Sequence, residues 1–296
     1  MAERITRPGR KRDMIQMNRS TPNENGLYSP LTKSIDIAET LMLIELTRDY
    51  GRLADWQDEA LFRLPQASRQ RRQEIVSAVR HKFLEHENDH FVSTPLLTLL
   101  TAPLLEIRLK RDLILAQYLR TTPLVWEAIQ QVVLPHAEAG ARPLTGPEQA
   151  EITLEDWMTF LGDRLNTTTP STVSKTRQHI TAHLTKFGLL EARPRPGDRI
   201  AKQFFAHFYE PDPGAFWFSL AVEFIEQGWT SRSLDYVLHQ SWTRIAYCAS
   251  PAYARFVMDE AERSAVVVTS FFGSEKQVTW RGPDIISNVL EAIKRG

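Results

Sequence analysis

Apolar side chains recur at helical spacing along most of this chain, and this period constrains the fold more than any other feature. Ile37 and Leu41 lie near one face of a helix, and Ile75, Val79 and Phe83 repeat every four residues. A helix turns about 100° per residue, so side chains three or four positions apart share a face. The pattern predicts a mainly helical chain whose apolar faces are buried in a core.

Capping residues and helix breakers divide the helical pattern into segments. Asp36 is suited to cap the first helix and has Glu39 three residues further on, as in a capping box. Pro123 stands where a helix would begin, which is the position that proline favours in a helix. Helices are predicted at about 35–46, 56–61, 68–87, 96–118, 124–134, 154–165, 171–187, 215–226, 231–247 and 283–293.

Changes in composition predict three parts of the chain. The first residues carry clustered positive charge among prolines and polar side chains, including Arg10, Lys11 and Arg12. This composition is typical of a solvated tail or of a basic arm that lies along phosphates. Glycines and prolines within 136–150 predict a linker. The predicted parts are a flexible basic arm (1–32), an N-terminal helical domain (33–140) and a C-terminal domain (150–296).

Charge and cysteine content exclude several classes of protein. The 36 basic and 36 acidic side chains give a net charge of zero, so any nucleic-acid surface needs its positive charge concentrated on one face. Cys248 has no partner for a disulfide, and a cysteine-based metal site is excluded. The longest uncharged apolar stretch, Phe91–Leu105, is too short to span a bilayer and contains prolines. We therefore predict a cytoplasmic protein without a membrane partner.

The most informative motif lies between Thr153 and Arg199. Thr153 and Asp156 form a capping pair, and a polar turn at Asn166–Pro170 separates this helix from the next one. The second helix ends at Gly188, which suits a left-handed cap, and a loop rich in proline and arginine follows. This order is typical of a helix-turn-helix followed by a wing. The predicted fold class is therefore mainly α: a helical bundle with a winged-helix-like helix-turn-helix unit and a small β-hairpin at Val266–Trp280.

Two basic surfaces are candidate DNA contacts. In the second helix of the motif, Val173, Ile180, Leu184 and Phe187 share a face that can pack inward. The remaining faces and the following loop carry donors that suit phosphates and base edges: Ser171, Thr172, Ser174, Lys175, Arg177, Gln178, Arg193, Arg195 and Arg199. The predicted helix at 68–87 adds Arg69, Arg71, Arg72, Arg80 and Lys82. Helix pairs of this form also occur as plain packing modules, and a basic helix face is often only a solvated face.

The order of these motifs resembles the BrxA family of the BREX phage-defence systems. The resemblance rests on the opening at 35–40, the Arg-rich helix, the stretch Ser171–Arg177, the Phe187–Leu190 segment and the aromatic stretch Phe216–Phe224. It covers about residues 33–293. It implies a mainly helical protein that binds double-stranded DNA as an accessory or regulatory component, alongside other BREX proteins.

No catalytic signature is recognisable in the sequence. P-loop, GxGxxG and GxSxG motifs are absent, so we predict no enzymatic activity, no cofactor and no metal. His86 and His90 are four residues apart and could form a metal pair at a helix end, which leaves a metal nuclease as an alternative. His179 and His183 are interpreted as surface or phosphate-contacting residues. A second alternative is an interaction scaffold that uses the aromatic stretch Phe216–Trp229.

Overall fold

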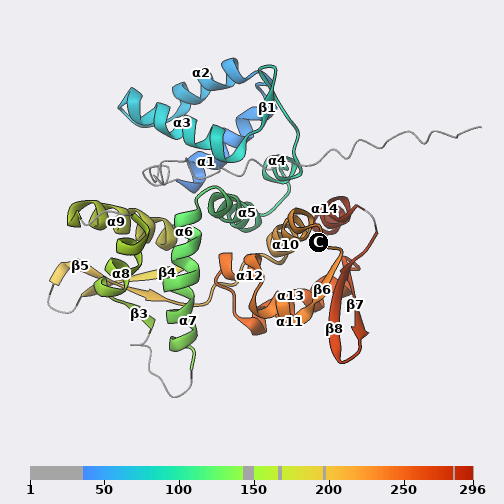
Figure 1. The fold of residues 1–296 in the computed structure, drawn as a ribbon. Coiled ribbons are helices and arrows are strands. Elements are labelled where there is room, and N and C mark those ends of the chain that lie inside the picture. Colours follow the sequence, from blue (N-terminus) through green and yellow to red (C-terminus); the bar gives the residue numbers. More distant parts are fainter. Residues whose placement is uncertain (1–35, 143–149, 166–168, 196–197, 283, 296) are drawn as a thin grey trace, which may run out of the picture.

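A computed structural model of the chain describes residues 36–142, 150–165, 169–195, 198–282 and 284–295 (Figure 1). This part is mostly helical and holds three small antiparallel sheets, one of them containing the predicted hairpin. The mainly α fold class and the hairpin are thus confirmed. Arg10, Lys11 and Arg12, with the rest of the predicted arm, lie outside the described residues.

Short helices form the first part of the described chain, and polar side chains cap α1, α3 and α4. Asp36 accepts the N–H of Ala38 at 3.0 Å, and the Ser68 hydroxyl accepts that of Arg71 at 3.4 Å, which satisfies donors at the two helix starts. The predicted helix over 96–118 is interrupted near Pro103, which cannot donate within a helix. The helices are α1 (Ile37–Glu45), α2 (Leu53–Arg63), α3 (Arg69–Phe83), α4 (Pro95–Thr101) and α5 (Ile107–Arg120).

The middle of the chain forms one continuous rod of three segments. Helix α6 (Pro123–Ala128) widens into a π-helical stretch, Ile129–Val133, and continues as α7 (Leu134–Gly140). Pro135 lacks the N–H that would bond one turn back, which accounts for the local change in winding. The predicted linker is wrong over residues 136–140, which are helical.

A three-stranded sheet with two helices lies on one side of this rod (Figure 1). The strands lie in the order β3-β5-β4, and every neighbouring pair is antiparallel. Helix α9 packs against α8 and β4, while α7 of the rod packs against β5. The elements are β3 (Glu151–Ile152), α8 (Leu154–Leu165), α9 (Pro170–Phe187), β4 (Leu190–Arg195) and β5 (Asp198–Ala206).

The last part of the chain lies on the other side of the rod (Figure 1). The single helix predicted over 231–247 is instead a short strand and two helices, since Ser233 and Ser241 each cap a new helix. Helix α13 was not predicted. The elements are α10 (Pro213–Gln227), β6 (Ser231–Ser233), α11 (Leu234–His239), α12 (Trp242–Ala246), α13 (Pro251–Arg263), β7 (Val267–Phe272), β8 (Glu275–Trp280) and α14 (Ile285–Arg295).

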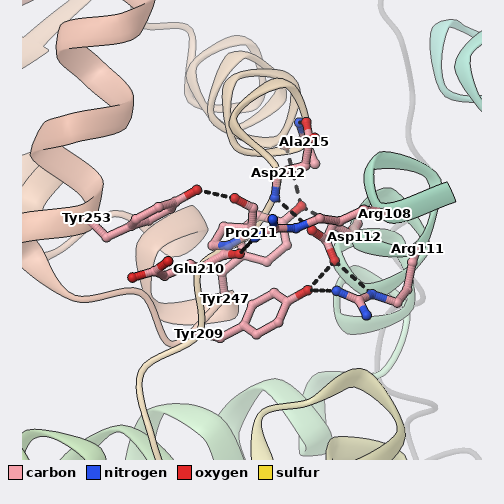
Figure 2. Close-up of polar contacts among 10 residues, drawn as sticks. All are labelled: Arg108, Arg111, Asp112, Tyr209, Glu210, Pro211, Asp212, Ala215, Tyr247 and Tyr253. Atoms are coloured by element: carbon pink, nitrogen blue, oxygen red, sulfur yellow. Dashed lines mark hydrogen bonds and ion pairs between the residues drawn. The ribbon is translucent and has the colours of Figure 1, made fainter. Parts of the chain in front are cut away.

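A buried carboxylate fixes the connection between β5 and α10 onto helix α5 (Figure 2). Asp112 is fully buried in α5, and its two carboxylate oxygens accept the Tyr209 hydroxyl at 2.6 Å and the Asp212 N–H at 2.7 Å. Arg111 lies 3.3 Å from the same carboxylate, and the Tyr247 hydroxyl donates to the Asp112 carbonyl at 3.0 Å. Burial raises the pKa of the Tyr209 hydroxyl well above its ordinary value. The cluster has a packing role: it holds the sheet unit and α10 on a common helix.

Candidate nucleic-acid interface

Helix α9 is held by one apolar face, as the sequence predicts. Val173, Ile180, Leu184 and Phe187 are each at most 2% exposed. The helix ends where Gly188 adopts a left-handed conformation with φ of 83°, a conformation that glycine accepts without steric cost. The packing of α9 is therefore determined locally, and its opposite face stays outside the core.

The opposite face of α9 is exposed and polar. Ser171, Lys175 and Gln178 are exposed and lie four and three residues apart, so they form one stripe along the helix. Thr172 is exposed beside it, and the first turn holds no acidic side chain. Lys175 makes no ion pair within the described part of the chain. A helix start of this kind favours an anion because its N–H groups point outward.

Two other predicted contacts of α9 are less accessible. Ser174 and Arg177 are half-buried. The Nε of Arg177 is buried and has no hydrogen-bond partner among the described residues. Only the outer nitrogens of this guanidinium are suited to reach a ligand.

The hairpin of β4 and β5 carries a second group of cations. Arg193 pairs with Glu191 at 2.6 Å and lies 4.5 Å from the centre of the Phe205 ring. This hydrogen bond holds the pKa of the Glu191 carboxyl below its usual range. Arg195 is exposed and, within the described residues, has no acidic partner. Arg199 lies in β5, but its side chain is outside the described part.

One exposed cation of this hairpin, Lys202, was not among the predicted contacts. Lys202 lies on β5, opposite Pro194 of β4. Its position three residues after Arg199 was the signal in the sequence that could have identified it as a further contact. Lys202 and Arg195 are thus exposed cations of the same hairpin.

The basic helix α3 differs from the predicted picture. Arg69 is exposed, but Arg71 pairs with Glu74 at 3.0 Å, and Arg72 and Arg80 are half-buried. The Arg80 guanidinium lies 3.1 Å from a ring nitrogen of His81. Three of the four arginines that were predicted as contacts on α3 are therefore at least partly engaged with the protein or shielded by it, and Arg69 remains exposed.

Lys82, the fifth predicted contact of α3, points into the protein. Its ammonium donates to the Thr122 hydroxyl at 2.7 Å and lies 5.2 Å from the centre of the Tyr118 ring. Burial lowers the pKa of Lys82 to about 8. The ammonium therefore serves internal contacts, which disagrees with its predicted place on an exposed basic face.

A buried histidine, His183, connects α9 to α5. Its prediction as a surface or phosphate-contacting residue is wrong. His183 is 1% exposed, and its Nδ1 shares a hydrogen bond with the Tyr118 hydroxyl. Its Nε2 is buried without a partner in the described part of the chain. Burial lowers the pKa of His183 to about 4, so the ring is neutral at pH 7. This histidine is a packing residue.

The predicted metal alternative finds no geometric support in the described residues. His86 and His90 do not lie on a helix, because α3 ends at Phe83 and a small hairpin follows. Asn88 and Asp89 form its two-residue turn with φ of 48° and 65°. No group of three or more potential metal ligands is found among these residues.

Cys248 is a buried residue. Burial raises the pKa of its thiol to about 12, so the thiol is protonated at pH 7.

Within the described residues, none of the helices is both long and apolar enough to cross a membrane.

No family model and no curated protein sequence matches this chain. The resemblance to the BrxA family consequently stays a prediction from the order of motifs. Function has to be inferred from the exposed groups of α9 and of the β4–β5 hairpin.

Proposed function

We propose that the unit from β3 to β5 is a winged helix that binds double-stranded DNA. Helix α9 would be the recognition helix and the β4–β5 hairpin the wing. The order of two helices followed by a hairpin, with β5 between β3 and β4, supports this interpretation. The observation that carries it is the exposed polar stripe of α9 beside a hairpin with exposed cations.

The chemistry of the stripe suits the major groove of DNA. An α-helix fits that groove, where Lys175 and Gln178 can donate to base edges. Ser171 and Thr172 lie at the helix start, where hydroxyl and N–H donors hold a phosphate. Arg195 and Lys202 on the hairpin would neutralise phosphates on an adjoining part of the backbone.

The binding we propose is dominated by phosphates and has weak sequence preference. The chain has no net charge, so the attraction depends on cations gathered locally and not on a field over the whole molecule. Binding of this kind weakens steeply with salt, because each neutralised phosphate releases counterions. We propose that the protein acts without catalysis or cofactor, as an accessory component beside other proteins of a BREX-type defence system in the cytoplasm.

Fluorescence anisotropy with a labelled random-sequence duplex tests this proposal. The slope of log affinity against log salt should fall by roughly 1.8 in the double variant Lys175→Ala with Arg195→Ala, at about 0.9 per lost phosphate contact. The matched control removes two exposed cations elsewhere, Arg255→Ala and Lys294→Ala on α13 and α14. The control should keep the parent slope.

Two results would contradict the proposal. One is an affinity that stays constant from low to moderate salt in the parent protein. The other is an equal loss of affinity in the two double variants, which would mean that general charge matters and the α9 surface does not.

A further inference from the structure

Strand β6 leaves one edge of its sheet open. The sheet order is β6-β8-β7, so β6 has a strand neighbour on one side only. The N–H of Trp280 donates to the Thr230 carbonyl at 3.4 Å, and antiparallel pairs alternate between bonded and non-bonded. Arg232 therefore bonds across to Val278, while the backbone groups of Ser231 and the N–H of Ser233 point outward.

A polar hollow of about 280 Å³ adjoins this open edge. Its walls come from β6, from the start of α11 and from Glu275 and Gln277 of β8. Asp235 of α11 and Gln240, the residue after that helix, also line it. An open strand edge beside a polar hollow is the arrangement with which sheets accept an extended peptide, since the backbone gives affinity and the hollow gives specificity.

Arg232 supplies an available positive charge at this place. It lines the hollow, and its guanidinium carbon lies 3.6 Å from the centre of the Trp229 ring. Its Nε is buried without a hydrogen-bond partner, and the guanidinium forms no ion pair within the described residues. A stacked guanidinium is held in one plane and is suited to bind a carboxylate with two hydrogen bonds.

The rim of the hollow carries the opposite charge. Asp235 is exposed and pairs with His239 at 3.0 Å, and the Glu275 carboxylate accepts the Gln277 amide at 3.3 Å. A ligand that bears only negative charge would meet repulsion from these two carboxylates. A ligand with a carboxylate for Arg232 and a basic group for the rim would match both.

We propose that β6 and this hollow bind an extended peptide segment of another protein that carries an acidic side chain beside a basic one. The peptide would add as a strand to the open edge of β6. Its acidic side chain would pair with Arg232, and its basic side chain would lie at Asp235 and Glu275. This surface lies on the other side of the rod from α9, so the two binding events involve different residues (Figure 1).

An array of random linear peptides, probed with the full chain, tests the proposal. Binders should be enriched in extended sequences with an acidic residue next to a basic one. The strongest binder is then synthesised with a fluorescent label and titrated by anisotropy against the parent protein and four variants. Melting curves of each variant show that the fold is kept.

Ser233 allows the contribution of its backbone N–H to be isolated. Its φ is −62°, so proline fits this position, and Ser233→Pro removes the outward N–H together with the hydroxyl that caps α11. Ser233→Ala removes the hydroxyl and keeps the N–H. Strand addition predicts a loss of roughly tenfold in peptide affinity for Ser233→Pro relative to Ser233→Ala.

The charge contact has its own matched pair of variants. Arg232→Gln should weaken the peptide by at least roughly tenfold, because it removes a charge-assisted contact. Arg255→Gln, an exposed change of equal charge on α13, should leave the affinity as it is. The proposal is overturned if no peptide of the array binds, if the two Ser233 variants bind equally, or if Arg232→Gln binds like the parent. Equal binding of free glutamate and of the peptide would also overturn it.

Discussion

Helices α3 and α9 are both rich in basic residues, but they use their cations in different ways. On α9, Lys175 is exposed and lies in a polar stripe with Gln178. On α3, Lys82 donates to Thr122 inside the protein, and Arg71 pairs with Glu74. The number of basic residues on a helix therefore does not identify a phosphate surface. A phosphate surface is identified by the groups that each cation contacts. A cation that is paired or buried has already exchanged its water contacts for contacts within the protein.

The two helices also meet through a common neighbour. Helix α5 packs against both, and its Tyr118 lies between Lys82 of α3 and His183 of α9. Tyr118 and His183 are buried and Lys82 is half-buried, so the inner faces of α3 and α9 pack onto the same helix.

The largest expected effect comes from the inner face of α9. Leu184 is fully buried, so Leu184→Ala should lower the free energy of unfolding by about 2–5 kcal/mol through lost packing and the cavity left behind. Lys175→Ala, on the exposed face of the same helix, should change it by less than about 0.5 kcal/mol. Urea denaturation measures both values. Equal effects would mean that the two faces of α9 are assigned wrongly.

A smaller effect comes from His183 and depends on pH. Its pKa is about 4 in the folded protein against an ordinary 6.5, so between these values the unfolded chain binds a proton that the folded protein does not. Its contribution to stability is complete above the ordinary pKa and is lost as pH falls, by about 2 kcal/mol between pH 7 and pH 5. Urea midpoints at the two pH values measure this loss.

Substitution assigns that pH dependence to His183. His183→Gln should flatten the profile, because glutamine binds no proton in either state. His90→Gln changes an exposed histidine of the small hairpin that follows α3 and should keep the parent profile. If His183→Gln and the parent lose the same stability on acidification, the buried histidine is not the cause.

Periodic segments with local signals were predicted well from the sequence. The capping by Asp36, the inner face of α9 and the left-handed Gly188 each depend on residues close in the chain. Helix α3 was predicted too long, because the residues after Phe83 are polar and resemble the end of a helix. The local signal that was missed is the pair Asn88 and Asp89, which forms the turn of a hairpin.

The candidate site depended on information that the sequence does not carry locally. Lys82 and His183 both contact Tyr118 of α5, and α5 lies far from each of them along the chain. The pairing of Arg193 with Glu191 is different, because the two residues lie two positions apart on one strand and this contact was available from the sequence. Solvated and buried basic residues look alike in a sequence when the partner comes from another element.

The smallest expected effect concerns the DNA affinity of α3 variants. Arg69→Gln with Arg72→Gln removes two of its cations, of which only Arg69 is exposed. We expect the slope of log affinity against log salt to fall by less than about 0.9, which corresponds to less than one phosphate contact.

Lys82→Met should leave the slope unchanged and should not lower the melting temperature, because the charge that it removes is disfavoured by burial. Anisotropy titrations of a labelled duplex at several salt concentrations measure the slopes. A loss for the α3 pair as large as that for Lys175→Ala with Arg195→Ala would mean that both helices bind phosphates equally, and the contrast between them would then be wrong.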